Sequence, residues 1–372
     1  MLIGVPKEIK DNEFRIGMTP ASVAEALHHG HEVMVETKSG LGIDASDDAY
    51  RKAGAQIMDT VEEVFAKADM IVKVKEPQAD ERKMLREDQV LFTYLHLAPD
   101  PEQTKDLVES GAICIAYETV TDVHGGLPLL APMSQVAGRM SVQAGAHALE
   151  MAQGGRGVLL AGVPGVQPAK VVILGGGVAG ENAAYMALGM GADVTVLERN
   201  VDTMRALVVR FGPALKTIYS TRLTIEEQVL AADLVIGAVL VPGAEAPKLI
   251  SGDMIKEMKK GAVLVDIAID QGGCFETSHA TTHADPTYIV DGVVHYCVAN
   301  MPGAVSHTST YALNNVTLPF VLALADKGYK QALLDDEHLM NGLNVHRGKV
   351  TYKAVADDLG YDYLDPREAI AA

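Results

Sequence analysis

The sequence contains little cysteine, little positive charge and no long apolar run. Its 372 residues include three cysteines, Cys114, Cys274 and Cys297, which form no CxxC pair and no even disulfide framework. We therefore expect free thiols in a reducing cytoplasm. The 31 Lys and Arg residues are outnumbered by 49 Asp and Glu, which gives a formal net charge of −18. This charge argues against nucleic acids and anionic membranes as partners.

The sequence also predicts neither a membrane span nor a secretion signal. The longest apolar candidate, residues 316–325, is interrupted by Pro319 and is shorter than the ~18–20 residues that cross a bilayer. Residues 1–11 lack the apolar core of a signal peptide. The hydrophobic fraction of 48% is that of an ordinary globular protein, and 372 residues suffice for about two domains.

Strand-like and helix-like segments alternate in both halves of the chain. Strands are expected at residues 2–5, 31–36, 70–74, 90–95 and 112–116, and again at 171–174, 193–197, 234–239, 262–267 and 293–298. Helices are expected at residues 20–29, 46–54, 61–68, 79–86, 101–110, 224–232 and 251–259. This alternation predicts an α/β protein with two doubly wound, Rossmann-like parallel sheets that carry helices on both faces.

Two further segments bear on the domain organisation. A long helix is expected over residues 134–152, with Ser134 as its N-cap. The chain after Ser306 is mostly helical to Lys330 and contains no further α/β unit. We expect this tail to pack back on the first half, although it could instead extend the second domain.

A glycine motif follows the first strand of the second half. The apolar residues 171–174 lead into Gly175, Gly177 and Gly180, a G-x-G-x-x-G pattern that precedes a helix-like segment. In dinucleotide-binding folds the first glycine permits a tight turn, the second lets the backbone approach a pyrophosphate, and the third allows close packing of helix and strand. The helix N-terminus offers N–H groups to the phosphates. The motif in this context predicts dinucleotide binding.

The next strand ends at an acidic residue, Glu198. A carboxylate there can accept hydrogen bonds from the adenosine ribose, whereas an NADP enzyme needs a cation for the 2′-phosphate. Glu198 therefore favours NAD, although the neighbouring Arg199 leaves NADP open.

Polar residues at the carboxyl ends of the predicted strands are the candidates for chemistry, because ligands of open α/β sheets bind there. They are Arg15, Lys75, His96 and Glu118 in the first half, and Asp270, Asn300 and Met301 in the second. Strand alternation points Lys73 and Lys75 to opposite faces, so at most one of them enters a site, and Lys75 at the strand end is favoured. Asp266 lies within its strand and could be structural, whereas Asp270 lies in the following loop.

Two of these residues have a chemistry that suits a site beside a nicotinamide. His96 could be structural, but an imidazole titrates near neutrality and suits a proton shuttle. Arg15 could be a solvated loop residue, but its planar guanidinium could also hold a carboxylate in bidentate fashion. His279 and His283 have the spacing of a helical metal pair, but their segment is short and has no third ligand nearby, so we expect no metal.

Motifs along the whole chain resemble those of the bacterial alanine dehydrogenases, which belong to one superfamily with the transhydrogenase alpha subunits. The resemblance rests on MLIGVPKEIKDNEFRIGMTP, KVKEP, LFTYLHLAPD, AYETV, APMSQVAGRMSVQAGA, VVILGGGVAG, VDIAIDQGGCFETSHATTH and YCVANMPGAVSHTSTYALNN. It implies a discontinuous substrate domain, residues 1–130 and 307–372, an NAD-binding domain, residues 131–306, a cleft between them, and a homohexamer.

The resemblance also implies site residues. Arg15 and Lys75 would hold the substrate, and His96 and Asp270 would perform acid–base catalysis. The NAD site implied is Ser134, Gly175, Gly177, Val178, Ala179, Gly180, Glu198, Ser220, Val239, Leu240, Ile267, Ala268, Ile269, Asp270, Val298, Ala299, Asn300 and Met301. The sequence departs from many relatives at Glu198 and Thr203, where they carry Asp and Lys, and this puts the affinity for the adenosine end in doubt.

The resulting hypothesis is the reversible, NAD-dependent oxidative deamination of L-alanine to pyruvate and ammonia. One alternative is the NAD-binding component of a proton-translocating transhydrogenase, which needs membrane-spanning partner domains that we do not expect here. The other is a non-catalytic NAD-binding protein, which would not require Arg15, Lys75, His96 and Asp270 together.

Overall fold

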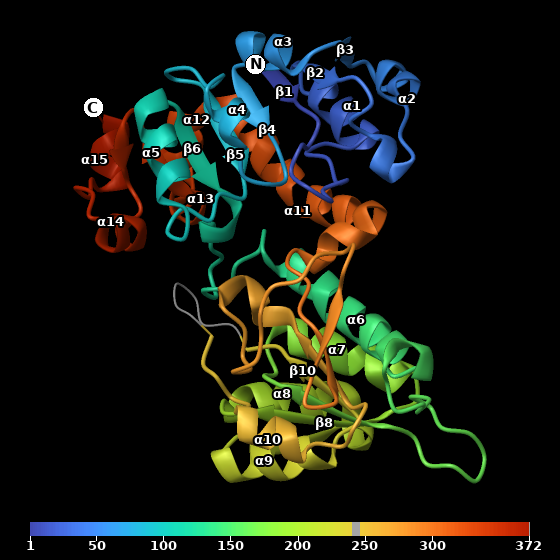
Figure 1. The fold of residues 1–372 in the computed structure, drawn as a ribbon. Helices are drawn as coiled ribbons and strands as arrows, with labels where there is room; N and C mark the ends of the chain where they lie inside the picture. The colour runs from blue at the N-terminus through green and yellow to red at the C-terminus, as the bar shows by residue number, and fades with distance from the viewer. Residues whose placement is uncertain (240–245, 372) are drawn as a thin grey trace. The chain divides into compact units, whose positions relative to one another are not determined.

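The computed structural model describes residues 1–239 and 246–371. It divides the chain into two compact units, one comprising Met1–Met133 with Gly303–Ala372 and the other Ser134–Pro302. Each unit contains one sheet with helices packed against it (Figure 1). The predicted fold class, two Rossmann-like α/β units, is confirmed. Which unit binds substrate and which binds NAD stays a prediction.

The sheet of the first unit has eight strands in the order β15-β14-β6-β5-β4-β1-β2-β3. The strands are β1 (Leu2–Val5), β2 (Glu32–Glu36), β3 (Gln56–Met58), β4 (Met70–Val72), β5 (Val90–Thr93), β6 (Ile113–Ala116), β14 (Leu343–His346) and β15 (Lys349–Val350). Strands β1 to β6 are parallel, whereas β14 and β15 are antiparallel to their neighbours. The sheet is therefore mixed, not purely parallel as the alternation predicted.

The helices of the first unit come from both ends of the chain. They are α1 (Pro20–His28), α2 (Asp47–Ala53), α3 (Val61–Lys67), α4 (Ala79–Arg82), α5 (Pro101–Ser110), α11 (Ser306–Lys327), α12 (Tyr329–Asp335), α13 (Glu337–Met340), α14 (Lys353–Leu359) and α15 (Pro366–Ala371). The side chains of Thr19, Ser46, Thr60 and Asp100 accept N–H groups of the first turns of α1, α2, α3 and α5. Such caps satisfy donors that have no partner inside a helix. Helices α1, α3 and α5 begin at the predicted residue, and α2 begins one residue later than predicted because Ser46 is its N-cap.

The C-terminal tail packs on the N-terminal half. Strand β14 extends the sheet at β6, and Asn314 of α11 accepts hydrogen bonds from the Thr19 backbone N–H, at 2.8 Å, and the Ser22 hydroxyl, at 2.9 Å. The hairpin β14–β15 was not predicted. Its turn residues Arg347 and Gly348 both have positive φ, which matches the tight turns that join antiparallel strands.

The sheet of the second unit has seven strands in the order β12-β13-β11-β10-β7-β8-β9. They are β7 (Lys170–Leu174), β8 (Asp193–Glu198), β9 (Lys216–Tyr219), β10 (Leu234–Gly237), β11 (Val263–Asp266), β12 (Thr287–Val290) and β13 (Val293–Tyr296). Strand β12 is antiparallel to β13 and the other pairings are parallel. Strand β12 was not predicted, although the Asp291–Gly292 turn that follows it is a strong hairpin signal.

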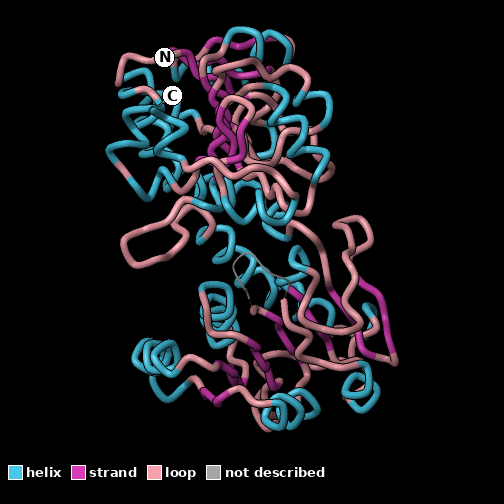
Figure 2. The backbone as a smooth tube through the Cα atoms, turned by 90° about the vertical axis from the view of Figure 1, so that its left-hand side faces the viewer, coloured by secondary structure: helices cyan, strands magenta, loops and turns pink. Residues whose placement is uncertain are grey.

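Successive residues of the central strands enter two different cores. On β7, Val171 and Ile173 pack with α6 (Ala131–Ala148) and α7 (Val178–Gly189). Val172 and Leu174 pack on the opposite face with α9 (Arg222–Ala231) and α10 (Gly252–Glu257). Strand side chains alternate between faces, so a run of apolar residues requires cover on both. This explains the two helical layers of the unit, which also contains α8 (Val201–Phe211) (Figures 1 and 2).

The predicted N-cap at Ser134 is wrong. Helix α6 begins at Ala131, so Ser134 lies inside it. Pro132 explains the earlier start, because proline is tolerated in the first turn of a helix, where no intrahelical N–H bond is lost. Helix α6 ends at Ala148, before the predicted end at 152.

Candidate active site

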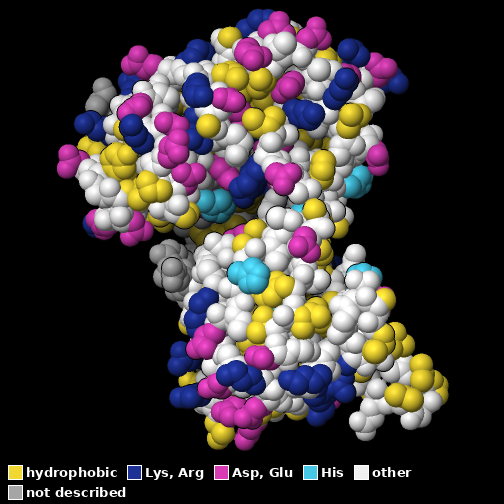
Figure 3. Space-filling model, in the orientation of Figure 1, with side chains coloured by type: hydrophobic (Ala, Val, Ile, Leu, Met, Phe, Trp, Pro, Cys, Tyr) yellow, Lys and Arg dark blue, Asp and Glu magenta, His cyan; other side chains and the backbone are white. Residues whose placement is uncertain are grey.

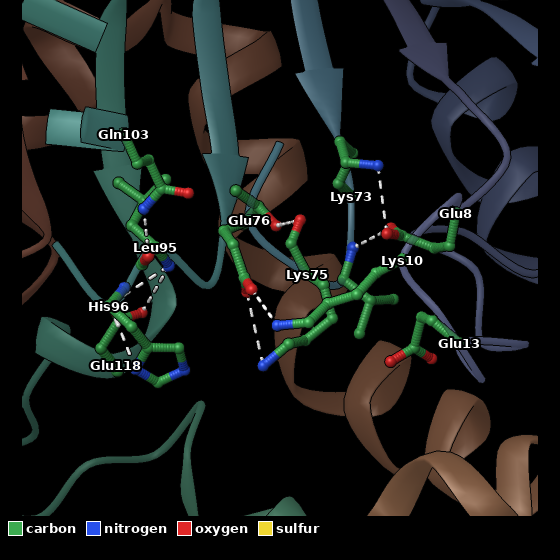
Figure 4. Close-up of polar contacts among 12 residues, drawn as sticks. Glu8, Lys10, Glu13, Lys73, Lys75, Glu76, Leu95, His96, Gln103 and Glu118 are labelled. Atoms are coloured by element: carbon green, nitrogen blue, oxygen red, sulfur yellow. Dashed lines mark hydrogen bonds and ion pairs between the residues drawn. The ribbon is translucent and has the colours of Figure 1, made fainter. Parts of the chain in front are cut away.

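The carboxyl ends of four neighbouring strands bring the polar candidates of the first unit to one sheet edge. Strands β6, β5, β4 and β1 are adjacent and parallel, and the segments that follow them carry Glu118, His96, Lys75 and Arg15 in that order. Figure 4 shows several of these side chains with their acidic neighbours. The structure thus brings these predicted residues to one edge of one sheet.

Arg15 is buried against an acidic residue that the sequence analysis did not identify. Its Nε and Nη2 donate to the two carboxylate oxygens of Glu13, at 2.7 and 2.5 Å, and its Nη1 donates to Sδ of Met133, at 3.0 Å. Burial disfavours the charge on Arg15, but the hydrogen bonds and negative charge of Glu13 outweigh it and raise the pKa of Arg15 above its ordinary value. Arg15 is therefore a permanently charged, oriented guanidinium and not a solvated loop residue.

Lys73 lies buried in a second acidic cluster. Its ammonium donates to Glu8, at 3.1 Å, and to Glu81, at 2.7 Å. The second oxygen of Glu8 accepts the backbone N–H of Val74, at 2.6 Å. Burial raises the pKa of Glu8 to about 7, against the attraction of Lys73 and together with the repulsion of Glu81 and Glu13. Through this hydrogen bond, Glu8 connects the loop after β1 to the backbone of Val74, next to Lys75.

Lys75 lies beside a carboxylate of its own. Its Nζ is 3.4 Å from Oε2 of Glu76, whose other oxygen accepts a hydrogen bond from Lys10. Burial raises the pKa of Glu76, but Lys75 and Lys10 outweigh it, so the net pKa lies below the ordinary value. The side chain of Lys75 is 13% exposed, so it is largely buried but still accessible to solvent.

His96 has an uncommon backbone conformation. Its φ is +52°, in the left-handed region that non-glycine residues rarely adopt. Its backbone N–H donates to Oε1 of Glu118, at 2.6 Å, and the N–H of Leu95 donates to the same carboxylate. The imidazole stacks on the ring of Tyr94, with centroids 5.9 Å apart, and is 45% exposed. The turn after β5 therefore presents an accessible, oriented imidazole.

The second unit gathers the predicted NAD residues at the carboxyl edge of its sheet, apart from Ser134 in α6. The segments at that edge are Gly175–Gly180 after β7, Glu198 at the end of β8, Ser220 after β9, Val239 after β10, residues 267–270 after β11 and residues 298–301 after β13. Leu240 lies outside the described residues. Binding of NAD by these residues stays a prediction.

The three glycines have the conformations that their positions in the motif require. Gly175 has a φ of +98°, which permits the turn. A Cβ on Gly180 would lie 1.9 Å from the carbonyl oxygen of Gly175, so the helix and the turn are in close contact there. A Cβ on Gly177, the N-cap of α7, would meet nothing within 4 Å. The open space beside Gly177 is where a phosphate could approach the backbone.

Glu198 makes several contacts with the backbone. One carboxylate oxygen accepts the N–H of Gly176, at 2.7 Å, and the other accepts the N–H groups of Arg199, at 2.6 Å, and Asn200, at 2.8 Å. Glu198 therefore holds the glycine turn against the end of β8, a structural role that the sequence analysis did not anticipate. A carboxylate has about four lone-pair positions, so these bonds leave room for the predicted ribose contact.

Asp266 and Asp270 differ as the sequence analysis suggested. Asp266 is buried and accepts hydrogen bonds from the Ala268 and Cys274 backbones and from the Ser278 hydroxyl, at 3.1, 2.8 and 2.5 Å. Burial outweighs these bonds and raises the pKa of Asp266. Asp270 is exposed on the 3₁₀ turn over Ile267–Gln271 that these bonds shape. A structural Asp266 thus supports the segment that carries Asp270.

The cysteines, the pair His279 and His283, and the longest helices were the remaining features singled out in the sequence. Cys114, Cys274 and Cys297 are buried and unpaired, as predicted. His279 stacks on Tyr288, and His283 contacts the carbonyl oxygen of Asn300. Within residues 1–239 and 246–371, no three His, Cys, Asp or Glu side chains form a metal-binding group, and no helix is long and apolar enough to span a membrane.

The chain matches two domains of one family along most of its length. Residues 4–137 match "Alanine dehydrogenase/PNT, N-terminal domain" and residues 141–353 match "Alanine dehydrogenase/PNT, C-terminal domain". Curated alanine dehydrogenases from Halomonas elongata, Mycolicibacterium smegmatis and Mycobacterium tuberculosis are 60%, 54% and 53% identical, and each alignment covers 100% of both chains.

Solved structures agree with these matches. A structure of L-alanine dehydrogenase superimposes with a TM-score of 0.94 at 52% identity, over 97% of this chain and 99% of that one. A transhydrogenase from Sinorhizobium meliloti superimposes with a TM-score of 0.81 at 25% identity, over 95% and 100% of the two chains. The chain therefore belongs to the alanine dehydrogenase/PNT family.

Proposed function

We propose that the protein is an alanine dehydrogenase that converts L-alanine, with NAD, to pyruvate and ammonia, and catalyses the reverse reaction. Full-length identity of 60% to a curated alanine dehydrogenase supports this activity. The structural observation that carries the proposal is the placement of Arg15, Lys75 and His96 on neighbouring loops at one sheet edge. The two cations can bind the carboxylate of an amino acid, and the accessible imidazole can transfer protons.

Arg15 and Lys75 bind the carboxylate side of the substrate. The formal net charge of the chain is −18, so an anionic substrate needs local cations to overcome the overall field. The guanidinium of Arg15 is held in one plane by Glu13, which prepares it for a second, bidentate carboxylate. Fixing the carboxylate at two points orients Cα–H, and such orientation contributes much of the rate acceleration.

His96 and Asp270 move protons. His96 removes a proton from the attacking water and returns it as the carbinolamine collapses to pyruvate and ammonia. Its exposure of 45% allows exchange of protons with solvent. Asp270, on the turn after β11, stabilises the positive charge that develops on the substrate nitrogen.

The second unit binds the cofactor. The 12-residue helix α7 directs the N–H groups of its first turn toward the open space at Gly177, a suitable place for a pyrophosphate. Glu198 would accept hydrogen bonds from the ribose hydroxyls, which favours NAD over NADP. When bound, NAD supplies the acceptor for the hydride that leaves Cα.

Absorbance at 340 nm tests the activity directly. Purified protein with L-alanine and NAD at alkaline pH should produce NADH, and NADP should support a much lower rate. The variants His96→Ala and Asp270→Asn should lose turnover but still bind NADH, as measured by fluorescence titration. Normal turnover in either variant would refute the assigned roles, and no absorbance change with either cofactor would favour a non-catalytic binding protein.

The likeness to a transhydrogenase supports a second candidate, the NAD-binding component of such an enzyme. That candidate predicts hydride exchange between two nucleotides, once a partner is supplied, and no reaction with L-alanine. The identity of 25%, against 52% for L-alanine dehydrogenase, favours the first candidate.

We further propose a cytoplasmic homohexamer. Three buried free thiols fit a reducing compartment. The hexamer is the assembly that the resemblance to bacterial alanine dehydrogenases implies, and light scattering of the purified protein would test it. A mass near that of one 39.5 kDa chain would contradict it.

A further inference from the structure

Glu13 and Arg15 form a buried pair within the loop between β1 and α1. Oε1 of Glu13 accepts both the Nε–H and the backbone N–H of Arg15, at 2.7 and 3.0 Å, and Oε2 accepts an Nη2–H, at 2.5 Å. The side chains of Glu13 and Arg15 are 0% and 2% exposed. Glu13 therefore contacts the guanidinium along one edge, and also the backbone that carries it.

The loop itself is anchored, so the pair has a defined position. The Ile16 N–H donates to the hydroxyl of Thr310, at 3.4 Å, and the Thr19 N–H donates to Asn314, both on α11. The Glu13 N–H donates to the carbonyl oxygen of Lys10, at 3.1 Å. These contacts fix the backbone on both sides of Glu13. The Glu13 carboxylate in turn holds the guanidinium at the end of the Arg15 side chain in one orientation.

A second carboxylate can bind the same guanidinium. Glu13 lies along one edge of the guanidinium, the Nε–Nη2 edge, and Met133 contacts Nη1, so Glu13 fixes the plane in which a ligand carboxylate would meet Arg15. An arginine without such a partner must lose rotamer freedom when it binds a ligand, and that entropy weakens binding. A carboxylate that orients the arginine in advance removes most of this cost.

We propose that Glu13 is a positioning residue for substrate binding, which holds Arg15 in the orientation that receives the carboxylate of pyruvate or L-alanine. This inference rests on the proposed alanine dehydrogenase activity and extends it to a residue that does not touch the reacting atoms. Figure 4 shows the Glu13 carboxylate among the polar groups of this sheet edge.

The reverse reaction separates a positioning role from a general structural one. Pyruvate carries a carboxylate and ammonium does not, so loss of Arg15 orientation must affect the two substrates differently. In Glu13→Gln, the amide cannot accept from both Nε and Nη2. We expect the KM for pyruvate to rise at least about tenfold, as for the loss of a charge-assisted hydrogen bond. The KM for ammonium and the Kd for NADH should change less than about twofold, because neither ligand is proposed to bind Arg15.

Two further variants control the experiment. Asp106→Asn removes a carboxylate from Arg82, another largely buried arginine of the same unit, which donates to Asp106 at 2.6 Å. It should lower the thermal stability without raising the KM for pyruvate. Glu13→Asp keeps the charge on a shorter side chain and should raise that KM less than Glu13→Gln does. If Glu13→Gln does not fold, the KM of Glu13→Asp decides the question.

A double variant tests whether Glu13 acts through Arg15. If it does, Arg15→Gln alone and Arg15→Gln with Glu13→Gln will have the same KM for pyruvate, since the second change has nothing left to act on. Additive effects would overturn the proposal, as would an unchanged pyruvate KM or equal increases for pyruvate and ammonium in the single variants. An inactive wild-type chain would refute the proposed function itself, and this inference with it.

Discussion

The carboxylate of Glu118 accepts the backbone N–H of His96 at 2.6 Å while His96 has a φ of +52°. The same carboxylate accepts the N–H of Leu95, at 3.1 and 3.2 Å to its two oxygens. Glu118, which follows β6, thus stabilises the turn that follows the neighbouring strand β5. Since a left-handed non-glycine residue costs about 1–3 kcal/mol, the hydrogen bonds of Glu118 offset strain that the position of the imidazole requires.

Replacing Glu118 by Gln should therefore impair catalysis through His96. Hydrogen bonds to a charged acceptor contribute about 1.5–3 kcal/mol, so we expect kcat to fall by about tenfold or more, while the Kd for NADH is unchanged. Initial rates and NADH fluorescence titration measure the two quantities. Asp122→Asn is the matched control, because Asp122 also accepts two backbone N–H groups, those of His124 and Gly126. A kcat within twofold of wild type in Glu118→Gln would contradict the positioning of His96 by Glu118.

The positive φ of His96 leads to a separate prediction about stability. Glycine adopts positive φ without penalty and alanine does not. Both substitutions remove the imidazole, so His96→Gly should be more stable than His96→Ala by about 1 kcal/mol, against the usual order of the two residues. Urea denaturation of the two inactive variants gives the difference. Equal stability, or a more stable alanine variant, would mean that this φ is not retained in solution.

Two glycines of the motif should have different roles, one in NADH binding and the other in stability. Gly177→Ala places a methyl group in open space, so the variant should fold normally but bind NADH at least about tenfold more weakly because the phosphate is displaced. Gly180→Ala places its methyl group 1.9 Å from the carbonyl oxygen of Gly175 and should lower the melting temperature. Gly189→Ala, on the same helix with nothing within 4 Å of the new Cβ, is the control and should leave NADH binding unchanged. Wild-type NADH affinity in Gly177→Ala would place the pyrophosphate elsewhere.

The buried Glu8 predicts a pH dependence of stability. Its pKa rises from an ordinary 4.5 to about 7 in the fold, so the folded state binds the proton more tightly than the unfolded state. The contribution of Glu8 to stability is complete below about pH 4.5 and is lost as the pH rises to about 7. Relative to Glu8→Gln, which does not titrate, the wild-type free energy of unfolding should fall by up to about 3 kcal/mol across this window. Parallel pH profiles of the two proteins would show that Glu8 does not titrate there.

The positions of the site residues along the sheet could be predicted from the sequence. Strand ends can be located by apolar periodicity, and parallel neighbours align their carboxyl ends at one edge. That is why His96 and Lys75 were correctly placed at the ends of adjacent strands. The partners of these residues could not be predicted in the same way. Glu13 is only two residues from Arg15, but in an irregular loop the spacing does not tell which way a side chain points.

The sequence by itself determined the α/β class, the glycine turn and the sheet edge at which polar residues gather, because these depend on local periodicity and on the conformational freedom of glycine. The tertiary structure decided three further features: Arg15 is held by Glu13, Glu198 supports the glycine turn, and β14 joins β6. The last two depend on contacts between residues distant in the chain, and the first depends on which direction a buried loop faces. Tertiary packing determines these distant contacts and the direction of the loop, and the pattern of residues along the chain does not predict either of them.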